Sequence, residues 1–222
     1  MNTEGLRTAM QQVWKSVREI KVESLGDNIF VFKFPYETEK KRVSYGGPWY
    51  FDKALMVLTE PSGVGDIKHQ SFQYTSFWVQ LYNVPLMCME KDTVQEMGKK
   101  IGKVEEVETD GSGECIGPFS RVRVSVDITQ SLKKVLLLEV ENGEEILRPV
   151  LYEKVPEICF CCGISGHQYR ICQSYKGQPK DQLAFGAWMK VLTKAEKAKQ
   201  NRNRDRWNRE ASQPNQDYQH QP

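Results

Sequence analysis

Four side chains that bind transition metals lie within fourteen residues of one another along the chain. Cys159, Cys162, His167 and Cys172 have the spacing C-x2-C-x4-H-x4-C. Three thiolates and one imidazole complete the tetrahedral shell that Zn²⁺ prefers in structural sites. A segment this short cannot build an apolar core, so a bound metal has to supply its folding free energy. The spacing therefore predicts a zinc knuckle over residues 154–175, with Zn²⁺ as the cofactor.

The residues between the ligands agree with this prediction but leave one choice open. Gly163 follows the second ligand and Gly166 precedes the histidine, where the chain has to turn tightly around the ion. Cys161 could replace Cys162 as a ligand, although only one residue would then separate it from Cys159, which strains the turn. A disulfide pair, a chance cluster and a zinc clip that binds nothing else are the other interpretations.

Aromatic and basic side chains accompany the cluster. Phe160 and Tyr169 lie between ligands in a peptide too small to bury both rings, so we expect at least one to stack on an unpaired base. Arg170 can contact phosphate or a guanine edge. Further along, Arg202, Arg204, Arg206 and Trp207 lie in a basic stretch that can add phosphate contacts. These residues predict a binding site for single-stranded RNA or DNA.

Charge is unevenly distributed along the 222 residues. Residues 1–153 hold 19 Lys and Arg against 23 Asp and Glu, whereas residues 154–222 hold 12 against 6. A polyanion would therefore be attracted to the C-terminal part. The sequence has no run of eighteen apolar residues and no signal-peptide pattern at its start, so we expect an intracellular protein of the nucleus or cytoplasm, with no membrane partner.

Catalysis finds little support in the sequence. It lacks a phosphate-binding Gly-rich loop with Lys, a nucleophile elbow, and the His-x-Glu with Pro-Cys-x-x-Cys of zinc deaminases. Four protein ligands would also close the zinc shell and leave no position for a reacting water. We therefore expect no enzyme activity and no small-molecule substrate.

The first sixty residues read as a small α+β unit. Leu6, Met10, Val13, Trp14 and Val17 recur at helical intervals and predict a helix of about three turns. Apolar stretches on either side of residues 26–28 predict a hairpin, residues 37–45 a helix and residues 54–59 a strand. This order, over residues 1–60, is that of a ferredoxin-like unit without its opening strand.

A second α+β unit is predicted over residues 61–153. Its pattern indicates strand 77–85, helix 92–101, strands 104–109 and 121–127, and a hairpin of residues 136–140 and 146–152 around Asn142-Gly143. The order resembles RNA-recognition folds, in which Phe77, Trp78 and Tyr82 could stack bases. Residues 121–127 carry no aromatic side chain, however, which favours packing of these rings in the core.

The remaining residues divide into two segments. Residues 176–192 contain Phe185, Trp188 and Met189, a short apolar segment that we expect to dock on the body rather than to stack on nucleic acid. Residues 193–222 are first basic and then rich in Gln, Asn, Ser and Pro, and predict a disordered basic tail. The fold class is therefore α+β: two small ferredoxin-like or RNA-recognition-like units, then the knuckle and the tail.

Several of these stretches resemble one known family. The stretches are 25–34, 41–43 with 46–52, 77–79 with 83–86, and 152–160 leading into the knuckle. They resemble plant zinc-knuckle proteins with an N-terminal domain of unknown function, which are similar to the first-reading-frame, Gag-like proteins of LINE-type retrotransposons. The resemblance covers about residues 4–192. It implies a plant origin and binding of nucleic acid and of zinc, with the same four residues as the zinc ligands, but no established activity.

One departure accompanies the resemblance. Members of the family have residues ahead of this point that supply the opening strand of the first unit, whereas this sequence begins at the helix. A three-stranded unit would have an exposed edge.

Two functions follow from the sequence. The first is a retrotransposon-derived, zinc-dependent protein that binds single-stranded RNA or DNA through the knuckle. The alternative is a protein-interaction or self-association module in which the knuckle is only structural. Substitution of Phe160 and Tyr169 distinguishes them, because only the first function requires these rings.

Overall fold

The computed structural model describes residues 3–61, 70–139, 143–193, 195–198 and 202. The chain divides into two compact units, Met1–Lys190 and Val191–Pro222. The first unit has a mixed α/β architecture with antiparallel sheets and two separate hydrophobic clusters. Among the described residues, no helix has the length and apolar character needed to span a membrane.

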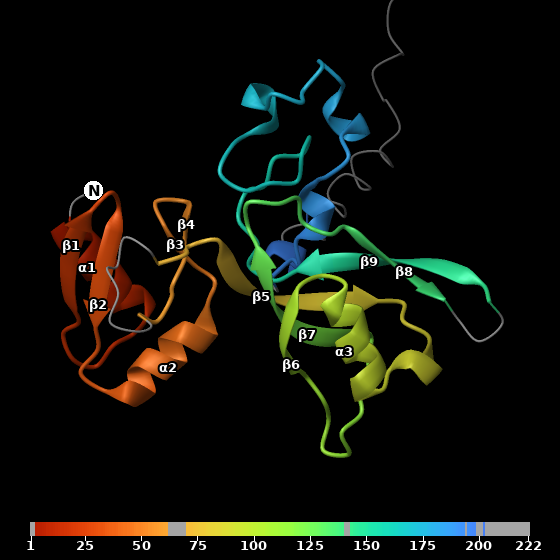
Figure 1. The fold of residues 1–222 in the computed structure, drawn as a ribbon, viewed down its shortest axis with the longest axis horizontal. Helices are drawn as coiled ribbons and strands as arrows, with labels where there is room; N and C mark the ends of the chain where they lie inside the picture. The colour runs from red at the N-terminus through yellow and green to blue at the C-terminus, as the bar shows by residue number, and fades with distance from the viewer. Residues whose placement is uncertain (1–2, 62–69, 140–142, 194, 199–201, 203–222) are drawn as a thin grey trace, which may run out of the picture. The chain divides into compact units, whose positions relative to one another are not determined.

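The N-terminal region contains two helices and two small sheets (Figure 1). Its elements are α1 (Thr3–Val13), β1 (Lys21–Gly26), β2 (Ile29–Lys33), α2 (Glu37–Gly46), β3 (Trp49–Phe51) and β4 (Ala54–Met56). Strand β1 pairs with β2, and β3 with β4, both antiparallel. Asp27 and Asn28 have φ values of 48° and 59°, as the turn of a tight two-residue hairpin requires. The predicted helices and hairpin are confirmed.

The core of this region forms around Trp14. Leu6, Met10 and Trp14 on one side of the first helical stretch are 0–1% exposed and pack with Ile20 and Val43. The helix was expected to reach Val17, and this part of the prediction was wrong. Helix α1 ends at Val13, and Val17 is 89% exposed because the chain has already left the helical path at Lys15, which has a φ of 50°.

A five-stranded antiparallel sheet follows in the first unit (Figure 1). Its elements are β5 (Tyr74–Tyr82), α3 (Lys91–Lys99), β6 (Lys103–Val107), β7 (Phe119–Asp127), β8 (Val135–Glu139) and β9 (Glu145–Tyr152). The strand order is β6-β7-β5-β9-β8. The hairpin predicted for β8 and β9 is present, while Asn142 of the predicted turn signal lies outside the described residues.

The ferredoxin-like and RNA-recognition-like arrangements are not confirmed. The N-terminal strands form two separate sheets instead of one. In the second region, the described residues between β7 and β9 contain strand β8 and no second helix. Their sequence explains this, because Leu136 and Leu138 are buried while Val135 and Leu137 are exposed, which is the period of two of a strand.

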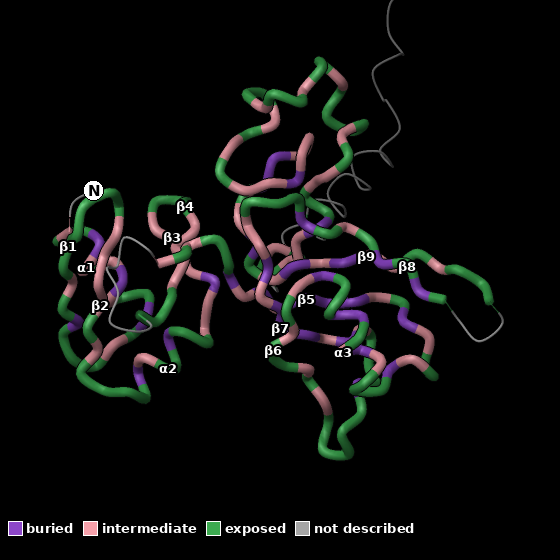
Figure 2. The backbone as a smooth tube through the Cα atoms, viewed as in Figure 1, coloured by how far each residue is buried: buried purple, intermediate pink, exposed green. Residues whose placement is uncertain are grey.

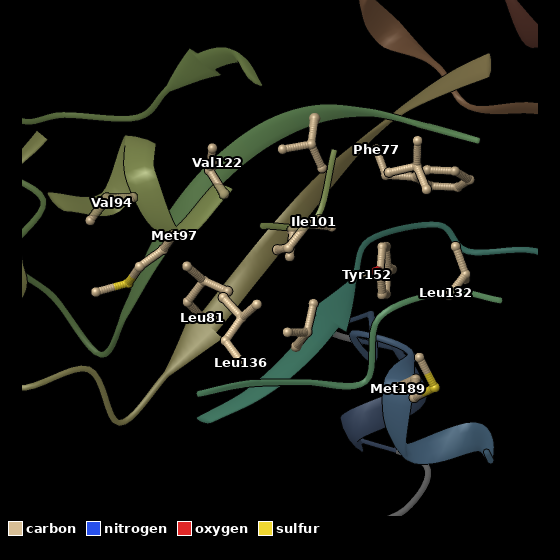
Figure 3. Packing of buried hydrophobic residues seen from close by; sticks show 14 of the residues in the cluster. Phe77, Leu81, Val94, Met97, Ile101, Val122, Leu132, Leu136, Tyr152 and Met189 are labelled. Atoms are coloured by element: carbon tan, nitrogen blue, oxygen red, sulfur yellow. The ribbon is translucent and has the colours of Figure 1, made fainter. Parts of the chain in front are cut away.

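The larger cluster includes residues between the five-stranded sheet and α3, and it extends to Leu132 and Met189 (Figure 3). Val122, Val124 and Val126 are at most 6% exposed, as the alternation of β7 predicts. Phe77 packs edge-on against Tyr152, with ring centroids 5.9 Å apart. This placement confirms that Phe77 packs in the core. Figure 2 shows the same concentration of buried residues along β5 and β7.

Arg121 and Arg123 alternate with the valines of β7 and so lie on its other face, where Arg123 is nevertheless buried. Its side chain is 4% exposed and its Nε donates to Oε2 of Glu105 at 2.9 Å. Its Nη1 also donates to the carbonyl of Tyr45 at 2.7 Å. Arg121 covers the ring of Trp78, with its Cζ 3.9 Å from a ring centroid. Arg123 lies away from the valine face but is covered by other parts of the chain.

The apolar segment after the knuckle docks on the sheet region, as expected. Met189, in a short 3-10 turn at Ala187–Met189, is 0% exposed and belongs to the larger cluster. Phe185 packs against the same cluster. Lys190 forms an isolated parallel bridge with Tyr152 at the end of β9. Trp188 stays 49% exposed.

Within the second unit, a reciprocal pair of hydrogen bonds starts a helical turn. The backbone N–H of Glu196 donates to Oγ1 of Thr193 at 3.2 Å, and the N–H of Thr193 donates to Oε2 of Glu196 at 2.8 Å. This is a capping box, which occupies two backbone donors that a helix start leaves unpaired.

Candidate metal centre and nucleic-acid interface

The four predicted ligands lie together in the structure. One ligand atom from each of Cys159, Cys162, His167 and Cys172 lies within 4.8 Å of all the others. Nε2 of His167 is 3.4 Å from Sγ of Cys162. Ligand atoms on a tetrahedral ion with bonds of about 2.3 Å are about 3.8 Å apart. The group therefore fits a single metal ion.

Local backbone structure brings these side chains together. The N–H of Gly163 donates to the carbonyl of Cys159 at 2.8 Å, and the N–H of Cys159 donates to the carbonyl of Ile164 at 2.8 Å. Gly163 and Gly166 have φ values of 75° and 100°, which residues other than glycine rarely adopt. The turns predicted at both glycines are confirmed. A 3-10 turn at Tyr169–Ile171 then leads to Cys172.

The knuckle is anchored to the sheet region at several points. The N–H of Phe185 donates to the carbonyl of Phe160 at 2.9 Å, and the N–H of Leu132 donates to the carbonyl of Gly163 at 3.1 Å. Ile158 belongs to the larger cluster, and Cys159 is 0% exposed. The metal group is therefore held at the border of a folded core and not on a free peptide.

The thiols of the group have different proton affinities. Hydrogen bonding with His167 lowers the pKa of Cys172 to about 6. Burial raises the pKa of Cys162 to about 11. Thiolates and not thiols bind metals, so a metal ion would have to displace the proton of Cys162.

Cys161 does not belong to the metal group. The four residues with converging ligand atoms include Cys162 and leave Cys161 out. The converging group therefore has two residues between its first two cysteines, as in the predicted spacing.

Beside the metal group, three aromatic rings form a half-exposed cluster, which we call the aromatic surface: Phe160, Tyr169 and Tyr175. The rings of Phe160 and Tyr169 are parallel within 2°, with centroids 6.1 Å apart. Tyr175 meets Tyr169 edge-on, with centroids 5.4 Å apart. The two predicted rings are therefore brought together, and the sequence analysis missed Tyr175 because it lies after the last ligand.

Two cations border the aromatic surface. Nζ of Lys180 lies 5.3 Å from the ring centroid of Phe160. Cζ of Arg170 lies 5.8 Å from that of Tyr169, and Arg170 is exposed. Lys180 was not among the predicted contacts, because its position depends on how residues 173–180 fold back toward Phe160. Rings and cations together offer stacking and charge at one place.

The tail residues that were predicted to contact nucleic acid do not belong to the described part of the aromatic surface. Arg202 lies in the second unit and is exposed. Arg204, Arg206 and Trp207 lie outside the described residues. Their role in binding stays a prediction.

Comparisons with known proteins find similarity for part of the chain. Residues 1–60 match the family described as "Domain of unknown function (DUF4283)". Over 102 residues the chain is 26% identical to the "Uncharacterized protein At4g02000" of Arabidopsis thaliana, covering 46% of this chain and 32% of that protein. The chain thus spans about a third of the length of this relative. No solved structure matches.

These matches agree with part of the resemblance noted in the sequence. They confirm a domain of unknown function at the N-terminus and similarity to a plant protein. The similarity to Gag-like retrotransposon proteins stays a prediction.

Proposed function

We propose that this chain binds one Zn²⁺ ion through Cys159, Cys162, His167 and Cys172, and single-stranded nucleic acid through the adjoining aromatic surface. The observation that carries the proposal is the parallel pair Phe160 and Tyr169, half-exposed beside a four-ligand group. A retrotransposon origin is consistent with this function and is part of the same proposal.

The donor set supports zinc as the metal. Three sulfurs and one imidazole nitrogen are the ligands of structural zinc sites, whereas Mg²⁺ and Ca²⁺ select oxygen ligands. With four protein ligands the shell is closed, so the ion would hold the loop and not act on a substrate. Its contribution is to fix residues 159–172, and with them the two rings.

The aromatic surface supports single-stranded nucleic acid as the ligand. Each base has an apolar face that stacks on aromatic rings, whereas bases inside a duplex are already stacked. Lys180 and Arg170 lie where they would offset phosphate charge. The basic residues Arg202, Arg204, Arg206 and Trp207 would extend the contact along the strand.

Fluorescence anisotropy of the full chain tests the proposal. The probes are fluorescein-labelled single-stranded dodecamers of mixed sequence, as RNA and as DNA, titrated with zinc and again with a chelator. Stacking contributes about 1–3 kcal/mol per base, so Phe160→Ala and Tyr169→Ala should each weaken binding about tenfold. Tyr74→Ala, which changes a ring that is 55% exposed at the start of β5, is the control and should bind like the unmodified chain.

Two results would contradict the proposal. Binding that is unchanged by the chelator would show that the metal group does not support the site. Equal binding by Phe160→Ala, Tyr169→Ala and Tyr74→Ala would show that the rings are not the contact.

A further inference from the structure

The core of the N-terminal region is open on one side. Five hydrophobic side chains of its cluster are buried, while nine more are only partly buried, among them Phe30, Phe32, Phe34, Met56 and Leu58. The larger cluster has the opposite ratio, with twenty buried and eight partly buried. Both counts refer to the described residues. Part of the apolar surface around Trp14 is therefore without a cover in this part of the chain.

The open side is a groove of about 810 Å³. Residues 27–32 and 54–61 line it as two continuous stretches, and Leu6, Trp14 and Val43 from the helical side line it as well. The first stretch contains β2 and the second contains β4. The size lies within the range of about 300–1,000 Å³ that is usual for ligand-binding clefts.

Both strands that line the groove have an unpaired edge. Strand β2 pairs with β1 and β4 pairs with β3, and among the described residues neither has a second partner. An unpaired edge presents backbone N–H and C=O groups to whatever lies beside it. A strand added in this groove could form backbone hydrogen bonds with one edge on each of its two sides.

The charges of the groove select an uncharged segment. Nζ of Lys40 lies 3.4 Å from Oε1 of Glu60, and Nε of Arg123 lies 2.9 Å from Oε2 of Glu105. The charged residues that line the groove thus form two ion pairs, each with no net charge, and the carboxylate of Asp27 is the remaining charge. A strongly charged partner would find little complementary charge here.

We propose that this groove binds an extended segment of a partner polypeptide as an added β-strand between β2 and β4. The segment is about five residues long, to match β2, uncharged, and apolar at alternate positions so that one face covers Phe30 and Phe32, which are only partly buried. A second copy of this chain is a less suitable source. Its alternating apolar strands β5 and β7 are already central in their own sheet, each with a partner strand on either side.

The test uses a fluorescein-labelled heptapeptide, Thr-Val-Thr-Val-Thr-Val-Thr, titrated against the full chain. A control peptide has Pro in place of the central Val, because Pro lacks the N–H that pairs with a strand edge. We expect saturable binding of the first peptide, and binding at least tenfold weaker for the second. Leu58→Asp, which places a charge in the groove, should weaken binding at least tenfold, whereas Leu137→Asp on the exposed face of β8 should not.

Hydrogen exchange locates the bound peptide and does not depend on the folding of Leu58→Asp. The amides of residues 29–33 and 54–58 should exchange more slowly when the peptide is present. Absent binding, equal binding of both peptides, or protection only at other residues would overturn the proposal. Protection of the same amides by concentration-dependent dimerisation of the unmodified chain would also overturn it, because a second copy would then be the occupant.

Discussion

Gly163 packs against the ring of Phe185 so closely that a β-carbon added to Gly163 would lie 2.4 Å from Cε1 of Phe185. Only glycine therefore fits at position 163 while the ring stays in place. Gly163 also has a φ of 75°. This contact joins the turn between the second and third metal ligands to the segment that docks on the sheet. The metal group and the apolar segment are therefore parts of one packed structure.

This contact predicts an asymmetry between the two knuckle glycines. Gly166 has a φ of 100° but open space around its α-carbon. Gly166→Ala should therefore cost only backbone strain, about 1–3 kcal/mol, and Gly163→Ala should cost more because the ring of Phe185 has to move as well. Urea unfolding of the zinc-loaded chain measures both. The double variant Gly163→Ala/Phe185→Leu should recover part of the loss, and no recovery would contradict the packing argument.

The docked segment makes a second prediction. Met189 is 0% exposed in the larger cluster, and its neighbour Trp188 is 49% exposed. Met189→Ala should lower the free energy of unfolding by about 2–5 kcal/mol, because it leaves a cavity in the core. Trp188→Ala should cost clearly less, although it removes a larger side chain. Equal losses in urea unfolding would show that the segment does not dock as described.

How much of the site the sequence can predict depends on sequence separation. The four ligands lie within fourteen residues, and their spacing alone limits the geometry, so the group could be predicted in full. The burial of Arg123 could not be predicted from the sequence, because Arg123 donates to the carbonyl of Tyr45, which lies 78 residues away along the chain. The pattern of residues 121–127 and the hairpin signal at Asn142-Gly143 likewise identified β7 and β8, but they do not give the order of all five strands.

The groove shows the same limit. Phe30, Phe32 and Phe34 recur at every second position of the predicted hairpin, which places them on one face. In the structure they are only partly buried, because β2 and β4 belong to different sheets. Local patterns predict which face is apolar, whereas the cover of that face depends on contacts between distant elements.

The choice between the adjacent cysteines gives a third prediction. Cobalt(II) serves as the probe, because its absorption reports thiolate ligands in a tetrahedral site. Cys162→Ser should lose the absorption or shift it and bind cobalt more weakly, since Cys162 belongs to the four-residue group. Cys161→Ser is the matched control, one residue away, and should keep the spectrum and affinity of the unmodified chain. The reverse pattern would assign Cys161 as the ligand.

The last prediction concerns the pH dependence of the body. Burial by itself would raise the pKa of Glu153, but hydrogen bonds from Arg121 and Gln80 outweigh it and hold that pKa below its ordinary value of 4.5. Nε of Arg121 donates to Oε1 of Glu153 at 2.8 Å, and Nη2 donates to Oε2 at 2.9 Å. The pair is thus bidentate, with side chains 24% and 21% exposed.

Because the folded-state pKa of Glu153 is lowered, its contribution to stability is present above pH 4.5 and is lost as the pH falls through the folded-state pKa. Glu153→Gln should therefore reduce the free energy of unfolding by about 1–3 kcal/mol at pH 7, with the difference shrinking below pH 4.5. Glu108→Gln, at a partner of Arg121 that is 53% exposed, should cost under about 1 kcal/mol. Urea unfolding between pH 3 and pH 7 measures both, and a pH-independent loss for Glu153→Gln would contradict the assignment.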